Sequence, residues 1–182
     1  MEHSKLWDYM EKNKEEYYRR MHDEQEKRLQ FIRNRPSIFL LSGPNESDMH
    51  AVVTELLKSN TGLIYVPLIQ GQYSGTDTTL YAQAIEKHQI IINDIDVNGA
   101  MAFKKHFQNK TRLFYLRVSE DIAFEENLRS RGDTEGDIQK RYANKLIDDS
   151  KIDLFDYVID HTDLGETVRQ ITEIITSETT LK

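Results

Sequence analysis

Five short apolar runs follow residue 36, and a stretch of helical composition separates each run from the next. This alternation is typical of a parallel sheet whose strands are joined by helices. The run Ile90-Ile91-Ile92 has no polar position, which indicates a strand buried on both faces. We therefore predict a three-layer α/β domain with a five-stranded parallel sheet, its strands at 37–42, 63–68, 89–94, 112–118 and 157–160. The helices are expected near 48–59, 77–87, 98–106, 120–130, 135–151 and 164–177.

The first 36 residues differ from the rest of the chain. They are rich in Glu, Lys, Arg and Gln, and they contain no glycine, which favours helix. Pro36 ends this segment because a proline moves the preceding residue out of the helical region. We predict a helical extension at 1–36 and the main domain at 37–182.

Apolar side chains in this extension recur at loosely helical spacing, and two interpretations of them stay open. They either pack on the main domain or form an arm for self-association or for a protein partner. The residues concerned are Leu6, Trp7, Met10, Tyr17, Tyr18, Met21, Leu29 and Ile32.

The overall charge argues against some classes of partner. The formal net charge is −7, so the chain lacks the broad basic field that binds nucleic acid, and we expect no nucleic-acid partner. No run approaches the roughly 18 apolar residues of a membrane span, and no membrane partner is expected. The absence of cysteine excludes disulfides and zinc-thiolate sites and fits a cytoplasmic protein. The six histidines show no metal-ligand spacing, and no metal site is predicted.

The turn after the first predicted strand has the layout of a phosphate-binding loop. Such a loop, G-x-x-x-x-G-K-[ST], wraps phosphate in backbone N–H groups and adds a lysine and a hydroxyl that holds magnesium. Gly43 stands at the first glycine, but Asp48 replaces the second glycine, Met49 the lysine and His50 the hydroxyl. We predict a degenerate loop in which Asp48 repels phosphate.

Several further motifs occur in series: G-Q-Y-S-G-T at 71–76, I-N-D-I-D-V-N-G-A at 92–100, L-R-S-R-G at 128–132, I-Q-K-R at 138–141 and F-D-Y-V-I at 155–159. In this order and spacing the chain resembles the guanylate kinase family over residues 37–177. Active members of that family transfer a phosphoryl group from ATP to GMP, which depends mostly on positioning and charge.

The resemblance implies candidate site residues. Arg131 and Arg141 match arginines that neutralise the transferred phosphoryl group, and they are the catalytic candidates. Asp94 and Asp96 match the acidic pair, of which the second reads guanine. The nucleotide-binding candidates are Gly43, Tyr73, Ser74, Thr76, Asp94, Asp96 and His161.

Each candidate also has a structural alternative. Asp94 and Asp96 can fix the turn or cap the next helix. Arg129, Arg131 and Arg141 can form an anion pocket, or they can pair with neighbours such as Glu125, Glu126, Asp133 and Asp137.

One part of the family pattern is missing from the chain. The resemblance implies a small lobe with arginines that hold the acceptor phosphate, but one predicted helix and one predicted strand fill the interval from Gly43 to Gly71. We therefore expect an inactive guanylate-kinase-like domain that serves as a binding or scaffold module, with a nucleotide or anion as a possible ligand of the remaining cleft. The alternative is a divergent nucleotide kinase, which would use ATP and Mg²⁺ as cofactors.

Overall fold

The computed structural model describes residues 7, 11, 13–44, 46–66, 78–118 and 121–181. The chain divides into two units, one at 1–35 with 181–182 and one at 36–180. The predicted residues Tyr73, Ser74 and Thr76 lie outside the described residues, and so does the side chain of Asp48.

The main unit is built on a five-stranded parallel sheet with the strand order β2-β3-β1-β4-β5. This confirms the predicted fold class. The strands are β1 (Ile38–Ser42), β2 (Leu63–Ile64), β3 (Ile90–Asp94), β4 (Thr111–Arg117) and β5 (Tyr157–Asp160). The second strand ends earlier than predicted, at Ile64, and the end of its predicted range lies outside the described residues.

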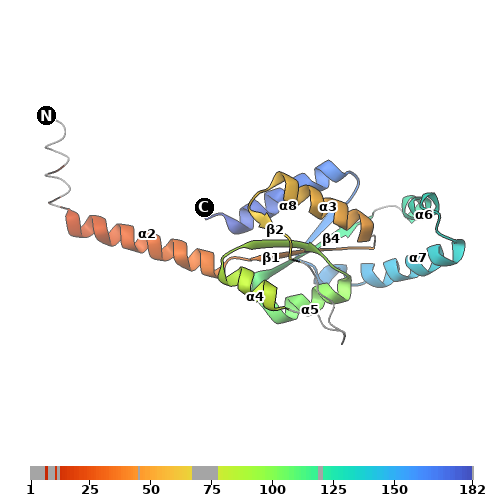
Figure 1. The fold of residues 1–182 in the computed structure, drawn as a ribbon, viewed down its shortest axis with the longest axis horizontal. Helices are drawn as coiled ribbons and strands as arrows, with labels where there is room; N and C mark the ends of the chain where they lie inside the picture. The colour runs from red at the N-terminus through yellow and green to blue at the C-terminus, as the bar shows by residue number, and fades with distance from the viewer. Residues whose placement is uncertain are drawn as a thin grey trace. The chain divides into compact units, whose positions relative to one another are not determined.

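Helices cover both faces of the sheet, α3 and α8 on one and α4 and α5 on the other (Figure 1). Their bounds are α3 (Glu46–Ser59), α4 (Thr79–Glu86), α5 (Val97–Phe107) and α8 (Leu164–Thr179). Successive side chains of a strand point to opposite faces, so β1 sends Phe39 and Leu41 toward α3 and α8 and Ile38 and Leu40 toward α4 and α5. All five residues of β1 are buried, as its central position requires.

Two further helices, α6 (Asp121–Ser130) and α7 (Glu135–Asp149), follow β4. They share a small apolar cluster of Phe124, Leu128 and Ile138, which is separate from the two clusters on the sheet. Short 3₁₀ turns lie at Gln108–Lys110 (η1) and Ile152–Leu154 (η2). The six helices predicted after residue 36 are therefore present, with ends that differ only slightly from the predicted ones.

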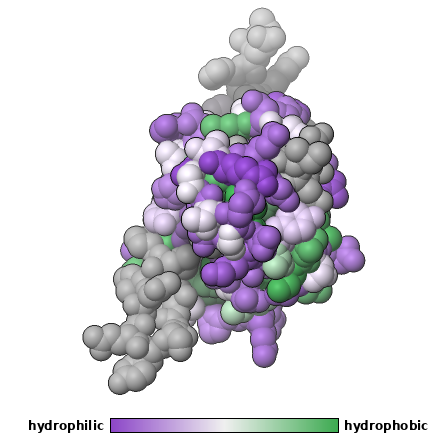
Figure 2. Space-filling view, turned by 90° about the vertical axis from the view of Figure 1, so that its right-hand side faces the viewer, coloured by the Kyte–Doolittle hydropathy of each residue, from purple (hydrophilic) through white to green (hydrophobic). Residues whose placement is uncertain are grey.

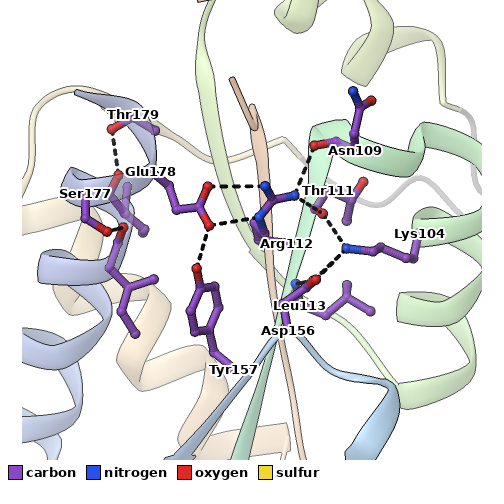
Figure 3. A network of polar contacts seen from close by, with 12 residues as sticks. Lys104, Asn109, Thr111, Arg112, Leu113, Asp156, Tyr157, Ser177, Glu178 and Thr179 are labelled. Atoms are coloured by element: carbon purple, nitrogen blue, oxygen red, sulfur yellow. Dashed lines mark hydrogen bonds and ion pairs between the residues drawn. The ribbon is translucent and has the colours of Figure 1, made fainter. Parts of the chain in front are cut away.

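Ion pairs hold the sheet and helices together at the end where β4 begins (Figure 3). Arg112 of β4 donates from Nε and Nη2 to the two carboxylate oxygens of Glu178 of α8, at 3.0 and 3.2 Å, and the Tyr157 hydroxyl of β5 donates to the same carboxylate. Burial favours protonation of Glu178, but the hydrogen bonds from Arg112 and Tyr157 outweigh it and lower the pKa of that carboxyl. Lys104 of α5 pairs with Asp156 at 2.7 Å, and Asp156 also accepts from the Leu113 N–H. This network lies at the end of the sheet where β4 begins, which is opposite to the carboxyl ends of the strands.

In the first unit, α2 (Lys14–Asn34) is a helix of 21 residues, none of which is buried. It confirms the helical extension. Among the described residues, no helix is both long and apolar enough to cross a membrane.

Candidate functional site

The carboxyl ends of β2, β3 and β1 meet at one edge of the sheet, because the strands are parallel neighbours. Ligands of open α/β sheets bind outside this edge, where the strand order reverses. Here the reversal lies at β1, which has β3 on one side and β4 on the other. The residues that follow these strands therefore define the candidate site.

Gly43 directly follows β1, and the reason for a glycine there is packing. A Cβ at residue 43 would lie 2.6 Å from the backbone carbonyl oxygen of Leu116 in β4. This oxygen belongs to the backbone of a buried strand and cannot move aside. The fold therefore needs glycine at this position whether or not a phosphate binds.

Met49, at the position of the phosphate-loop lysine, is a core residue. Its side chain is 1% exposed and lies in the cluster with Phe39, Leu41, Val52 and Leu56. A lysine at this position of a working loop reaches phosphate with a charged group, whereas Met49 fills apolar space between α3 and the sheet.

Asp94 ends β3 and lies beside His50 of α3. The distance between His50 Nδ1 and Asp94 Oδ1 is 3.6 Å, and His50 is largely exposed whereas Asp94 is mostly buried. Asp94 Oδ1 itself is buried and accepts no hydrogen bond from the described residues. Tyr65 follows β2, and its burial, with the negative charge of Asp94, raises the pKa of its phenol. The start of α3, the end of β3 and the residue after β2 thus bring an imidazole, a carboxylate and a phenol to one edge.

Asn93, the residue before Asp94, is fully buried and bonds in several directions. Its Nδ2 donates to the Val66 carbonyl at 2.6 Å and to the Tyr81 hydroxyl at 2.7 Å, and its Oδ1 accepts from the Asp94 N–H at 2.9 Å. The Tyr81 hydroxyl donates to Val66 as well. These bonds fix the segment after β2 against β3 and hold the backbone of Asp94 in place.

Asp96 has the capping role that was one of its two predicted alternatives. Its side chain accepts from the N–H groups of Asn98 and Gly99, at 2.9 and 3.0 Å, and begins α5. Both N–H groups donate to Oδ1 of this exposed carboxylate.

The candidate arginines lie in the α6 and α7 region. Arg129 pairs with Glu125 and Glu135, at 3.1 and 2.9 Å, and Arg141 pairs with Asp133 at 3.1 Å. Arg131 is an exposed residue of the turn between the two helices. The ion pairs of Arg129 with Glu125 and of Arg141 with Asp133 are among the neighbour pairs that were the structural alternative to an anion pocket. Figure 2 views the protein from the side of α6 and α7 and shows a mostly hydrophilic surface, with hydrophobic residues gathered at one side.

His161 follows β5 and is fixed by local bonds. Its ring nitrogen Nδ1 lies 2.9 Å from the Thr167 hydroxyl. Its backbone N–H donates to the backbone carbonyl of Arg117. Arg117 forms a two-point ion pair with Asp160, at 2.6 and 3.0 Å, and this pair lowers the pKa of the Asp160 carboxyl. The structure thus places His161 at the same edge of the sheet as Asp94, on the far side of β1 and β4.

Sequence reasoning missed two groupings. One is His50 with Asp94, which belong to α3 and β3 and are far apart in the sequence, so no local spacing could reveal them. The other is the buried Lys145, which pairs with Asp149 at 2.7 Å while Asp149 also accepts from the Tyr115 hydroxyl at 2.6 Å. The helical i,i+4 spacing of Lys145 and Asp149 was the available signal, but it did not reveal that Lys145 is buried.

Comparison with known proteins identifies the family. The model of the guanylate kinase family matches residues 49–178, which is most of the chain. The chain belongs to the guanylate kinase family. The match begins at Met49, so the turn at Gly43 precedes it.

Curated relatives agree with this assignment. The chain is 33% identical to the guanylate kinase of Rickettsia felis over 125 residues, which cover 68% of the chain and 64% of the relative. It is 32% identical to the guanylate kinase of Prochlorococcus marinus over 108 residues, 59% of the chain and 58% of the relative. The chain thus spans about three fifths of the length of these relatives.

Solved structures support the fold. The guanylate kinase of Anaplasma phagocytophilum superposes with a TM-score of 0.58 at 17% identity, over 82% of this chain and 89% of that one. A shikimate kinase from Bacteroides thetaiotaomicron gives a TM-score of 0.50 at 10% identity, over 76% of this chain and 96% of that one. At these identities the likeness concerns the fold, which is that of the P-loop kinases.

Proposed function

We propose that this guanylate kinase family member acts by binding, as a scaffold or ligand-binding domain, and does not transfer phosphate efficiently from ATP to GMP. The observation that carries this proposal is the burial of Met49, which is 1% exposed in the core. Removal of a cation that stabilises the transferred phosphoryl group costs a factor of roughly 10³ or more in rate. Methionine is uncharged in every rotamer, so Met49 cannot supply this cation.

The acceptor side supports the same proposal. The interval from Gly43 to Gly71 holds α3 and β2 and has no room for the small lobe that binds the acceptor phosphate. No arginine occurs in the sequence between Arg35 and Arg112. Two-point recognition of a phosphate depends on arginine, so a GMP phosphate lacks such a partner in this part of the chain.

A divergent nucleotide kinase is the second candidate, and two observations favour it. The curated relatives are named guanylate kinases. The resemblance of the sequence motifs to that family also implies that Asp94, Asp96, Arg131 and Arg141 stand at the positions of the family's acidic pair and arginines. Such an enzyme would use ATP with Mg²⁺. The residues at the phosphate loop do not fit ATP and Mg²⁺. Met49 replaces the lysine that contacts the phosphates, and His50 replaces the hydroxyl that binds magnesium.

Nucleotide titration with an activity assay separates the two candidates. We expect no phosphoryl transfer from ATP to GMP above the background of a protein-free sample, measured by chromatography of the nucleotides with Mg²⁺ present. The Arg141→Ala variant should behave like the unchanged protein. If instead the protein forms GDP, and Arg141→Ala lowers that rate about 10²-fold or more, the divergent kinase is correct and the binding proposal fails. Calorimetry with ATP, ADP, GMP and GDP then identifies any nucleotide that binds without turnover.

We also propose that α2 associates with α2 of a second copy in antiparallel orientation. Tyr17, Tyr18 and Met21 form an exposed apolar patch over little more than one turn near the start of the helix. The first turn of α2 is acidic and its last turn contains Arg33. The interval from Glu15 to Arg33 is about five helical turns, so the two side chains lie on the same side of the helix. In an antiparallel pair, Glu15 of each copy faces Arg33 of the other, which makes the helix complementary in charge to itself.

Charge reversal in the chain of 182 residues tests this association. We expect Glu15→Arg and Arg33→Glu each to weaken the dimer about tenfold, because each replaces two attractive contacts with two repulsive ones. The double variant should regain most of the lost affinity, since it restores both pairs with exchanged signs. Light scattering at several protein concentrations measures the mass. If the unchanged protein is monomeric, the proposed association is wrong. If the double variant dimerises as weakly as the single variants, the antiparallel arrangement is wrong.

A further inference from the structure

We propose that the amino edge of the sheet, at the opposite end from the candidate site, binds an acidic segment of a protein partner. Residues 86–89 and 104–110, which lead into β3 and β4, form this surface, the basic edge. Two independent observations support the proposal: the charge of these segments and the backbone conformation of two of their residues. Binding at the basic edge requires neither a nucleotide nor phosphoryl transfer.

The two segments of the basic edge lie at the same level of the sheet, one on each side of β1. Ile38 of β1 pairs with Ile91 of β3 and with Thr111 of β4. Neighbouring strands are about 4.8 Å apart, so β3 and β4 begin roughly 10 Å from each other. The helices that precede these strands also touch, since the rings of Tyr81 in α4 and Phe103 in α5 lie 4.8 Å apart. The ends of α4 and α5 therefore form one surface.

This surface is basic although the chain as a whole is acidic. Its charged and titratable residues are four lysines, two histidines and one glutamate: Lys87, Lys104, Lys105, Lys110, His88, His106 and Glu86. Lys104 pairs with Asp156, whereas Lys87 and Lys105 are exposed residues. Since the net charge of the chain is −7, the basic edge carries a local charge opposite in sign to that of the whole protein.

Part of this charge has a structural explanation. Both α4 and α5 end at the basic edge, and the negative end of a helix dipole favours lysine in the last turn. Lys104 and Lys105 lie in the last turn of α5, so their positions follow from the dipole. The dipole does not explain the residues at positions 88 and 108.

His88 and Gln108 have a backbone conformation that normally belongs to glycine. Their φ angles are 57° and 47°, and they are the non-glycine residues with positive φ in the part of the chain that the structure describes. The Gln89 N–H donates to the Ala84 carbonyl around His88, a helix ending in which glycine is the usual residue at the position of His88. With its ψ of −118°, Gln108 has the angles of the first central residue of a type II′ turn, which also favours glycine. A side chain at either position costs free energy that glycine would avoid, and such strain is typical of functional sites.

The donors of the basic edge select the class of partner. Lysine, imidazole and amide groups each donate to a carboxylate, whereas two-point recognition of phosphate uses arginine. The basic edge contains no arginine, and Arg112 at the same end of the sheet is paired with Glu178. The net charge of −7 also repels a long polyanion such as nucleic acid. A short protein segment rich in Asp and Glu therefore fits this surface.

Fluorescence anisotropy with a labelled peptide of eight glutamates tests the binding. We expect the chain of 182 residues to bind the peptide at low salt and added salt to weaken the complex, because salt screens exposed charges. Lys87→Glu and Lys105→Glu should each weaken binding about tenfold, since each replaces an attractive contact with a repulsive one. Lys140→Glu, at an exposed position of α7, is the matched control. It changes the net charge by the same amount and should alter the affinity less than about twofold.

The same assay contains the results that would overturn the proposal. If the unchanged protein does not bind the peptide at low salt, or if Lys105→Glu binds it as tightly as the unchanged protein does, the basic edge is not the binding surface. A labelled oligonucleotide of eight thymidines is measured in parallel. If the oligonucleotide binds more tightly than the peptide, and Lys105→Glu abolishes this binding, the edge serves nucleic acid and the proposal is wrong.

Glycine substitution tests the role of the strained residues. Gln108→Gly should raise the unfolding temperature by about 2–4 °C, because it relieves the strain, and should weaken peptide binding about threefold, because a donor is lost. Asn109→Gly is the control for stability. The φ angle of Asn109 is not positive, so glycine there only increases the freedom of the unfolded chain and should lower the unfolding temperature. If Gln108→Gly binds the peptide as tightly as the unchanged protein, the side chain at residue 108 is not part of the binding surface and the proposal fails.

Discussion

Replacement of Met49 by lysine is expected to lower the free energy of unfolding by roughly 3–5 kcal/mol, the cost of an uncompensated charge in a protein core. Met49 is 1% exposed and packs against Phe39, Leu41 and Val52, none of which can pair with an ammonium group. A sequence-based repair of the phosphate loop would introduce this same lysine. The structure predicts that the repair destabilises the domain.

The control for this experiment is Met49→Leu, a substitution that keeps the volume and the apolar character. It should cost less than about 1.5 kcal/mol. Urea denaturation followed by circular dichroism measures both variants. If the lysine variant is as stable as the leucine variant, the side chain at residue 49 can leave the core and reach the loop, and the main argument for the lost kinase activity no longer holds.

Asn93→Leu is expected to cost roughly 2–4 kcal/mol, although the two side chains have similar shapes. The substitution removes the partner of the Val66 carbonyl, of the Tyr81 hydroxyl and of the Asp94 N–H at once. Each buried polar group left without a partner costs about 1–3 kcal/mol, and the remaining bond from Tyr81 to Val66 reduces the total.

An exposed asparagine provides the comparison. Asn109→Leu should change the free energy of unfolding by less than about 0.5 kcal/mol, because residue 109 contributes only its backbone carbonyl to Arg112. Urea denaturation measures both substitutions. Equal effects of the two would mean that the buried network around Asn93 does not hold the segment after β2.

The fold could be predicted from the sequence because its signals are local. The apolar run Ile90-Ile91-Ile92 marks a strand buried on both faces, and β3 spans it. Asp96 precedes a helical stretch, and the structure shows it as the cap of α5. The pairs of Arg129 with Glu125 and of Arg141 with Asp133 join residues that are close in sequence.

The candidate site could be predicted only in part, because its contacts are not local. The substitutions at Met49 and His50 were visible, but the burial of Met49 depends on how α3 packs on the sheet. The approach of His50 to Asp94 depends on the pairing of β1 with β3. Gly43 was predicted from the layout of the loop, but its packing constraint was not, because the atom that a Cβ there would meet is the carbonyl oxygen of Leu116, on a strand that comes much later in the chain.

The central place of β1 has a consequence for synthesis of the chain. Ile38 pairs with Ile91 of β3 and with Thr111 of β4, and two helices and β2 are made before the first of these partners. During translation β1 therefore leaves the ribosome long before either neighbouring strand exists. An apolar strand with open edges is prone to aggregate until it is paired. Ribosome-bound chains that stop before β3 should thus be the stage at which this protein most needs a chaperone.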